Sequence, residues 1–147
     1  MIRKFKNSDT EQVMNLWLAG NEDAHSFVKK GYWRSHYSEV QEALLEASIF
    51  VYETDGKIQG FIGMLNEYIA GIFVAKDLRS HGIGRQLLNY VKQRYEKLSL
   101  EVYQKNNRAI AFYQREGFSI LSEAVDEDTD EKEYIMVWKK ENRIIFS

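Results

Sequence analysis

A basic, glycine-containing stretch, RSHGIGR, occupies residues 79–85 between an apolar run and a segment with helical periodicity. The first N–H groups of a helix have no intrahelical partner, and the helix dipole favours an anion beside them. Gly82 and Gly84 have no Cβ, so a ligand can approach the backbone closely there. Two arginines and His81 add positive charge at the same end. The stretch therefore predicts a binding site for a phosphate or pyrophosphate group.

The known phosphate-binding loops make further demands that this stretch does not meet. A P-loop has a lysine and then serine or threonine after its last glycine, and Arg85 stands in the place of that lysine. A dinucleotide fingerprint ends in glycine or alanine where this chain has Leu87. A nucleotide-binding α/β protein is therefore disfavoured. An alternative without a ligand also remains: the stretch is a flexible, glycine-containing loop before a surface helix.

A second group of residues follows in LEVYQKNNRAIAFYQREGF, residues 100–118, which combines a strand, an asparagine pair and an aromatic helix. With the upstream stretch, this order resembles the GNAT acetyltransferase superfamily over most of the chain. Among its members, the chain is most similar to small bacterial proteins, some of which acetylate protein lysines. The family's acyl-CoA motif R/Q-x-x-G-x-G/A matches Arg79, Gly82 and Gly84, and its pattern N-x-x-A-x-x-F-Y-x-x-x-G-F matches Asn106, Ala109, Phe112, Tyr113, Gly117 and Phe118.

The resemblance implies a site for acetyl-CoA as cosubstrate. In the family, the segment that matches RSHGIG binds the CoA pyrophosphate together with the helix N-terminus, in agreement with the anion argument. The pantetheine arm bonds to the preceding strand as an added strand would. Asn106 matches a family asparagine near that arm, and it is also a residue type expected at a helix N-cap, so both roles can hold. The implied cofactor residues are Ile72, Phe73, Val74, Arg79, Ser80, His81, Gly82, Ile83, Gly84, Arg85, Asn106, Ala109, Phe112 and Tyr113.

Acetyl transfer to an amine needs two groups that handle protons, because an ammonium must lose a proton before its nitrogen attacks and the departing thiolate gains one. Tyr113 stands where the family keeps its tyrosine acid, unless it is an ordinary helix aromatic. Glu101 resembles the base of some members, unless it only faces solvent. Other members carry the base on the earlier strand, where this chain has Tyr68, while Glu67 points to the opposite face. A water chain ending on a carboxylate stays an alternative.

The amine-bearing acceptor is expected beside NEDAHSFVKKGYWRSHY, because the family builds its acceptor side from the first helices and the loops near the splay. These aromatic side chains suit a partly apolar amine pocket, and they equally suit a helix pair packed onto the sheet. The acidic run DEDTDEKE predicts a solvated hairpin loop, which would favour a cationic acceptor if it overhung the site. The predicted acceptor-pocket residues are His25, Phe27, Trp33 and Tyr68.

The segments that must position these residues alternate between strands and helices. An Asp-Gly pair between two apolar runs predicts a hairpin over residues 49–65. A helix is predicted in residues 7–20, with Ser8 or Asp9 as its N-cap and Gly20 as its stop. The resemblance implies an α+β GNAT fold: a mixed, mostly antiparallel central sheet of about seven strands with a splay between the fourth and fifth, flanked by about four helices. Further strands are predicted at residues 2–5, 69–75, 98–103, 118–125 and 133–139, and further helices at 37–48, 83–95 and 107–117.

The composition fits a single domain over residues 1–147. A formal net charge of −2 argues against a nucleic-acid partner bound through bulk charge, and no apolar run could span a membrane. The start MIRKFKNSD has no apolar signal region, so a cytoplasmic location is expected. No cysteine is present, and no His-Glu spacing suggests a metal. Either a monomer or a homodimer fits.

We therefore expect an acetyl-CoA-dependent N-acetyltransferase that works by direct attack in a ternary complex. The acceptor stays open between a protein lysine, an N-terminal amine and a small-molecule amine. The rival is a non-catalytic acyl-CoA binding module or sensor. Such a module would keep the glycine stretch but would not need Glu101 and Tyr113 to converge on the thioester.

Overall fold

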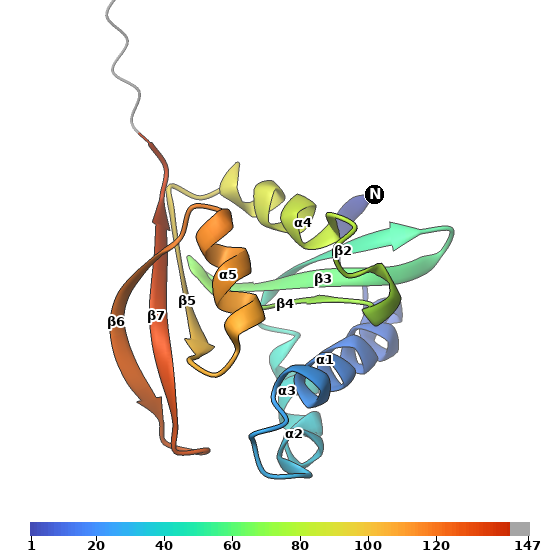
Figure 1. Cartoon of the computed structure of the whole chain (residues 1–147). Coiled ribbons are helices and arrows are strands. Elements are labelled where there is room, and N and C mark those ends of the chain that lie inside the picture. The colour runs from blue at the N-terminus through green and yellow to red at the C-terminus, as the bar shows by residue number, and fades with distance from the viewer. Residues whose placement is uncertain (142–147) are drawn as a thin grey trace, which may run out of the picture.

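Two apolar runs joined by Asp55 and Gly56 form the first hairpin of the computed structural model, which describes residues 1–141. Both turn residues have positive φ, 52° and 79°, as a two-residue hairpin turn requires. The predicted hairpin is confirmed, and it belongs to a seven-stranded sheet of order β1-β2-β3-β4-β5-β7-β6 (Figure 1). The strands are β1 Ile2–Lys4, β2 Ser48–Thr54, β3 Lys57–Leu65, β4 Tyr68–Val74, β5 Lys97–Tyr103, β6 Ser119–Asp126 and β7 Glu131–Lys139.

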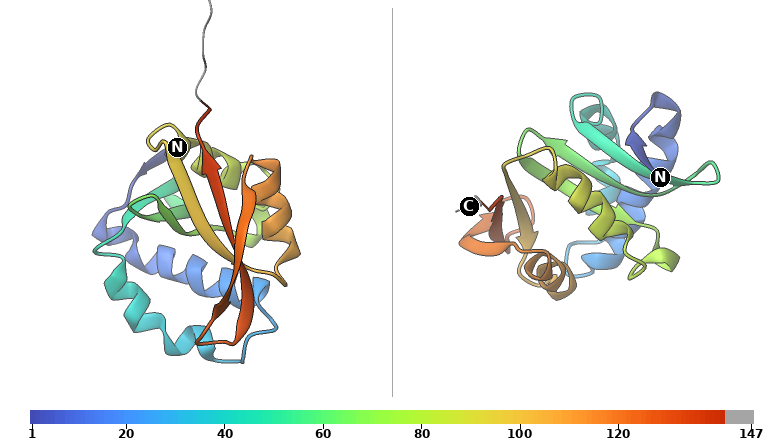
Figure 2. Two further views of the ribbon diagram at one scale, coloured as in Figure 1. Left: turned by 90° about the vertical axis from the view of Figure 1, so that its left-hand side faces the viewer. Right: turned by 90° about the horizontal axis from the view of Figure 1, so that it is seen from above.

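The sheet opens between β4 and β5. These strands are parallel and pair through Tyr68 and Ser99, whereas the other neighbouring strands pair antiparallel. Beyond that point β4 and β5 diverge, and Figures 1 and 2 show β5, β7 and β6 running steeply across the direction of β2, β3 and β4. The predicted mixed, mostly antiparallel GNAT fold with a splay between the fourth and fifth strands is confirmed.

Helices cover both faces of this sheet (Figure 1). The buried residues of α4 recur at helical spacing, and they share one core cluster with Tyr113 of α5 and with Leu98 and Leu100 of β5. Val13 of α1 belongs to a second cluster with Phe61 of β3, on the other face. The sequence did not predict the short helix α2, because a helix of 4 residues is too short to show a hydrophobic periodicity. The helices are α1 Thr10–Ala24, α2 Tyr32–Ser35, α3 Tyr37–Ala43, α4 Ile83–Lys92 and α5 Asn107–Arg115, with 3₁₀ turns at Asn7–Asp9 and Lys76–Leu78.

The first helix shows where a glycine was misinterpreted. Asp9 takes the N-cap position of α1, as predicted, but the helix does not stop at Gly20 and continues to Ala24. A Cβ built on Gly20 would lie 2.6 Å from Cδ1 of Phe73 on β4. The prediction of a stop was wrong because this glycine lets α1 lie close to the ring of Phe73.

Candidate active site

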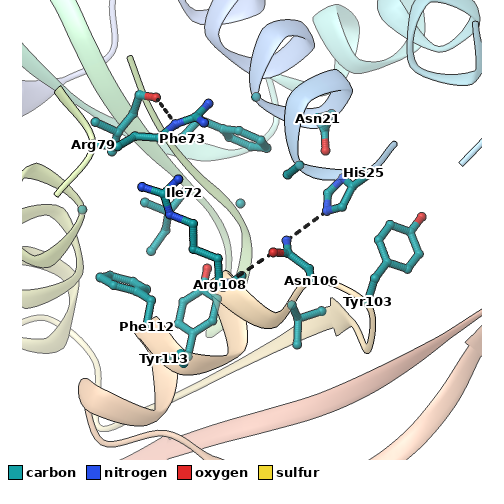
Figure 3. Close-up of a pocket in the computed structure, with 18 of the residues that line it drawn as sticks. Asn21, His25, Ile72, Phe73, Arg79, Tyr103, Asn106, Arg108, Phe112 and Tyr113 are labelled. Atoms are coloured by element: carbon teal, nitrogen blue, oxygen red, sulfur yellow. Dashed lines mark hydrogen bonds between the residues drawn. The ribbon is translucent and has the colours of Figure 1, made fainter. Parts of the chain in front are cut away.

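A cavity of about 770 Å³ lies where β4 and β5 diverge. Side chains reach it from α1, from α5 and from the loop before α4 (Figure 3). Of the residues predicted for the cofactor, only His81 does not line it, and both predicted catalytic residues do. The lining contains Ile72, Phe73, Val74, Arg79, Ser80, Gly82, Ile83, Gly84, Arg85, Glu101, Asn106, Ala109, Phe112 and Tyr113.

The N-terminus of α4 faces this cavity through Gly82, Ile83 and Gly84. Gly82 is the N-cap residue and has a φ of 85°, a left-handed conformation that glycine adopts without strain. No described side chain caps the helix, so its first N–H groups are left for a ligand. This geometry fits the predicted binding of a pyrophosphate anion.

The two arginines of the glycine stretch are engaged within the protein. The guanidinium of Arg79 pairs with the carboxylate of Asp23 at the end of α1, and its Nε donates to the carbonyl of Val74 at 3.4 Å (Figure 3). Nε of Arg85 lies 3.5 Å from Oε1 of Glu116, just after α5. A bound pyrophosphate would compete with these carboxylates for the guanidinium groups.

The edge of β4 that faces β5 is open along the cavity. On its other side, β4 pairs with β3 from Tyr68 to Val74. Ile72, Phe73 and Val74 all line the cavity. An open strand edge presents N–H and C=O groups to an extended ligand, so an added strand such as a pantetheine arm has partners here.

Asn106 combines two contacts at the start of α5. Its Oδ1 accepts a hydrogen bond from the backbone N–H of Ala109 at 3.2 Å, which confirms the predicted N-cap. Its Nδ2 therefore faces Nε2 of His25 at 3.1 Å and donates to it. Burial lowers the pKa of His25 to about 4, so the imidazole is neutral and can accept this bond. Asn106 thus links α5 to the end of α1 (Figure 3).

Tyr113 extends from α5 into the buried wall of the cavity (Figure 3). Its ring packs against Phe112 and Phe118, with centroids 5.2 and 5.5 Å away. Burial, and then the nearby Tyr68, raises the pKa of its hydroxyl. The phenol therefore stays protonated at neutral pH, which is the state that a proton donor needs.

The wall of the cavity also carries two carboxyl groups and a phenol. Glu101 of β5, Glu133 of β7 and Tyr68 of β4 all line it. Burial, and then the charges of Glu101 and Glu133, raises the pKa of Tyr68 to about 12. Glu133 was not among the predicted residues, and it stands in the acidic run that we expected to be a solvated loop. We refer to Tyr68, Glu101 and Glu133 as the acceptor end.

Aromatic side chains lie beside the acceptor end. The ring of Tyr103 lies 4.9 Å from that of His25 and 6.5 Å from that of Trp33, and all three residues line the cavity. Phe27 contacts His25 and Tyr103 at 5.7 and 5.5 Å but does not belong to the lining. Of the four predicted acceptor-pocket residues, Phe27 is thus the one that does not line the cavity and instead packs against residues that do.

The acidic run contacts the same aromatic group. Asp126 accepts a hydrogen bond from the hydroxyl of Tyr103 at 2.6 Å, and Asp128 accepts one from Tyr32 at 3.3 Å. The run is therefore more than a solvated loop, because its carboxylates lie close to the acceptor end. Their negative potential favours a cation there.

The sequence missed other lining residues besides Glu133. Arg108 follows Asn106 by two positions on α5, and Figure 3 shows its side chain extending across the cavity from α5. Asn21 is buried on α1, where its Nδ2 donates to the carbonyl of Trp17 at 2.9 Å. A signal for Arg108 was present, since it stands inside the matched asparagine pattern. Asn21 is the first residue of the segment NEDAHSFVKKGYWRSHY, but no pattern in that segment singled it out.

Two further features concern the described residues 1–141. Within them, no three histidine, aspartate or glutamate side chains gather as metal ligands. Nor does this part of the chain contain a helix long and apolar enough to cross a membrane.

Comparison with known proteins extends these observations. Residues 46–120 match the family model described as "Acetyltransferase (GNAT) domain". The chain is 41% identical to the peptidyl-lysine N-acetyltransferase YiaC of Escherichia coli, over 94% of this chain and 96% of that protein. The solution structure of apo-form YjaB from Escherichia coli matches with a TM-score of 0.83 at 21% identity, covering 96% and 98% of the two chains. PaiA N-acetyltransferase from Thermoplasma acidophilum, in complex with coenzyme A, matches with a TM-score of 0.78 at 20% identity, covering 95% and 98%.

Proposed function

The chain belongs to the GNAT acetyltransferase family, and we propose that it transfers the acetyl group of acetyl-CoA to the ε-amine of lysine side chains in proteins. As a member of this family, it is an acetyl-CoA-dependent N-acetyltransferase that acts on an amine. The identity of that amine, a lysine side chain, is what we propose. The observation that carries the proposal is one cavity that joins an uncapped helix N-terminus, the buried phenol of Tyr113 and the carboxyl groups of the acceptor end. The lysine specificity is supported by the similarity to the peptidyl-lysine N-acetyltransferase YiaC and by the negative charge around that end.

Acetyl-CoA would lie along the cavity with its pyrophosphate at the N–H groups of α4. Its pantetheine arm would follow the open edge of β4 beside Ile72 and Val74, and its thioester would reach the neighbourhood of Tyr113. Arg79 would turn from Asp23 toward the phosphates, because two anions compete for one guanidinium. The alternative role of the glycine stretch, a softened loop before a surface helix, does not explain why it lines the cavity.

The chemical step replaces the C–S bond of the thioester by a C–N bond. The amine nitrogen attacks the thioester carbon, the tetrahedral intermediate collapses, and the CoA sulfur leaves with the electron pair of the C–S bond. Tyr113 donates its phenolic proton to that sulfur. The chain contains no cysteine, so a thiol cannot carry the acetyl group in between, and the amine attacks directly in a ternary complex.

Glu101 would remove a proton from the acceptor ammonium, and the variant Glu101→Gln tests this role. Turnover is expected to fall about 10- to 100-fold while the affinity for acetyl-CoA stays near that of the wild type. The loss should shrink as the pH rises, because more of the amine is then deprotonated and needs no base before it attacks. Thiol release measured across pH, with calorimetry for binding, gives both quantities. An equal loss at every pH would mean that Glu101 positions the acceptor.

The acceptor itself is tested by comparing amines of different classes with acetyl-CoA. The panel contains a peptide with a blocked N-terminus and one lysine, a lysine-free peptide with a free N-terminus, a polyamine and an aminoglycoside. We expect kcat/KM for the lysine peptide to exceed the others by about 10-fold or more. A preference for the α-amine of the lysine-free peptide would contradict the lysine proposal and leave the acetyltransferase assignment intact.

We also propose that the enzyme acts in the cytoplasm, where acetyl-CoA and newly made proteins occur together. The bacterial relative YiaC and the absence of an apolar run in the sequence support this location. Fractionation of cells that express a tagged chain would test it.

A further inference from the structure

Two strands place a pair of glutamates on one face of the sheet. β5 and β7 are antiparallel neighbours, with Glu101 opposite Ile135 and Glu133 opposite Tyr103. Opposite residues share a face, and so do alternate residues along a strand. Glu101 and Glu133 are therefore diagonal neighbours on the face of Tyr103, and both line the cavity.

The pair has no cation of its own within the described chain. Some carboxylates elsewhere in the protein pair with arginines: Asp9 with Arg3, Asp23 with Arg79, and Glu116 with Arg85. Within residues 1–141, neither Glu101 nor Glu133 takes part in an ion pair. An acceptor ammonium would supply the positive charge that this part of the chain does not.

The surroundings of Glu133 let it exchange a proton near neutral pH. Burial, the charges of Glu101 and Asp126, and a hydrogen bond with Glu101 raise the pKa of Glu133 from 4.5 to about 7. Two other titratable groups here are neutral: Tyr68 on β4, whose pKa is raised to about 12, and His25 at the end of α1, whose pKa is lowered to about 4. Glu133 is therefore ionised in about half of the molecules at pH 7, and the ionised form can take up a proton.

The reaction removes two protons from the acceptor nitrogen, since an ammonium becomes a secondary amide. One leaves before the attack, and the second leaves after the C–N bond has formed. A single carboxylate that holds the first proton cannot take the second until it has released the first. We infer that Glu133 and Glu101 act together as the proton acceptor for the amine, so that each can take one of the two protons. This inference rests on the proposed acetyl transfer to an amine and adds Glu133 to its machinery.

The protons balance in this scheme. The carboxylate nearer the ammonium takes the first proton, and the other takes the proton that the nitrogen loses from the tetrahedral intermediate. The thiolate takes the proton of Tyr113 when the C–S bond breaks. One proton from the pair restores Tyr113 and the other goes to solvent, so the net products are the amide, CoA thiol and one proton.

The test is Glu133→Gln, assayed with whichever amine the wild type acetylates best. Wild-type kcat/KM is expected to fall as the pH falls below about 7, because Glu133 then takes up a proton. In the variant, kcat at neutral pH should be lower by up to about 10-fold, and the fall below about pH 7 should be lost, since glutamine takes up no proton. Glu123→Gln on β6 removes the same charge outside the cavity and should keep the wild-type profile. Acetyl-CoA affinity should be unchanged in both.

A second readout does not depend on activity. The folded protein holds the proton of Glu133 more tightly than the unfolded chain, because its pKa is raised from 4.5 to about 7. Protonated Glu133 therefore stabilises the folded protein at a pH below the pKa of this group in the unfolded chain. This stabilisation is lost as the pH rises through about 7. Glutamine stays neutral, so the melting temperature of Glu133→Gln relative to the wild type should increase between about pH 5 and about pH 8.

The outcomes separate this inference from the proposed acceptor. A Glu133→Gln protein with wild-type kcat and an unchanged pH profile would overturn the shared proton role. If the wild type prefers an amine other than lysine, the lysine proposal fails while this comparison, made with the preferred amine, still decides the role of Glu133.

Discussion

Gly84→Val is expected to weaken acetyl-CoA binding at least about 100-fold, a loss of about 3 kcal/mol of binding free energy. Gly84 lies in the first turn of α4 and lines the cavity. A Cβ built there would lie 3.5 Å from Cζ of Phe112 and 3.8 Å from Cγ2 of Val74, which is ordinary contact. Alanine therefore fits, whereas the two further methyl groups of valine would occupy the space next to the helix N–H groups.

Titration calorimetry with acetyl-CoA measures this effect, and Gly84→Ala should give an intermediate loss. Ala43→Val places a valine on the exposed surface of α3, away from the cavity, and should bind like the wild type. Wild-type binding should also weaken as salt rises, because Arg79 and Arg85 act through charge. Unchanged affinity for acetyl-CoA in a folded Gly84→Val protein would contradict the proposal that the pyrophosphate binds at the N-terminus of α4.

Tyr113→Phe is expected to lower turnover by roughly 10- to 1000-fold, at or below the usual range for general acid catalysis. The ring and its packing against Phe112 and Phe118 remain, and only the donor to the CoA sulfur is removed. The lower limit is small because a thiolate is a fair leaving group without help. Affinity for acetyl-CoA and the melting temperature should stay close to those of the wild type, since the variant keeps the shape of the wall.

Thiol release with the preferred amine gives the turnover of Tyr113→Phe, and Tyr95→Phe provides the matched control. Tyr95 is a partly buried phenol that packs against the core and does not line the cavity, so its loss should leave turnover unchanged. Full turnover in Tyr113→Phe would contradict the assignment of Tyr113 as the general acid. It would also strengthen the rival interpretation, an acyl-CoA binding module that keeps the glycine stretch without catalysis.

The sequence predicted best those parts of the site that are local in the chain. Gly82 and Asn106 each act through a helix end a few residues away, so spacing alone indicates what they do. The proposed acid role of Tyr113 rests on the resemblance of the same short pattern to the GNAT family. The hairpin turn and the apolar faces of the helices are also local, whereas the sheet with its splay was implied by the resemblance to the GNAT superfamily.

The sequence could not predict contacts made between distant elements. Glu133 reaches the acceptor end only because β7 pairs with β5 in the register that puts it opposite Tyr103. The ion pair of Asp23 with Arg79 depends on where the end of α1 lies against the loop before α4. Gly20 was misinterpreted for the same reason, since its role depends on a ring of β4. A charged run or a lone glycine carries no information about such partners.

The most direct test of the account is thiol release by the wild-type protein, first with acetyl-CoA alone and then after addition of the lysine peptide with a blocked N-terminus. Direct attack at a site that joins Tyr113 to the paired carboxyl groups predicts no burst of thiol before the peptide is added. Afterwards, each CoA thiol released should match one acetylated lysine in the same sample, counted by mass spectrometry. A burst equal to the enzyme concentration without peptide, or thiol released with no acetylated amine, would contradict the account.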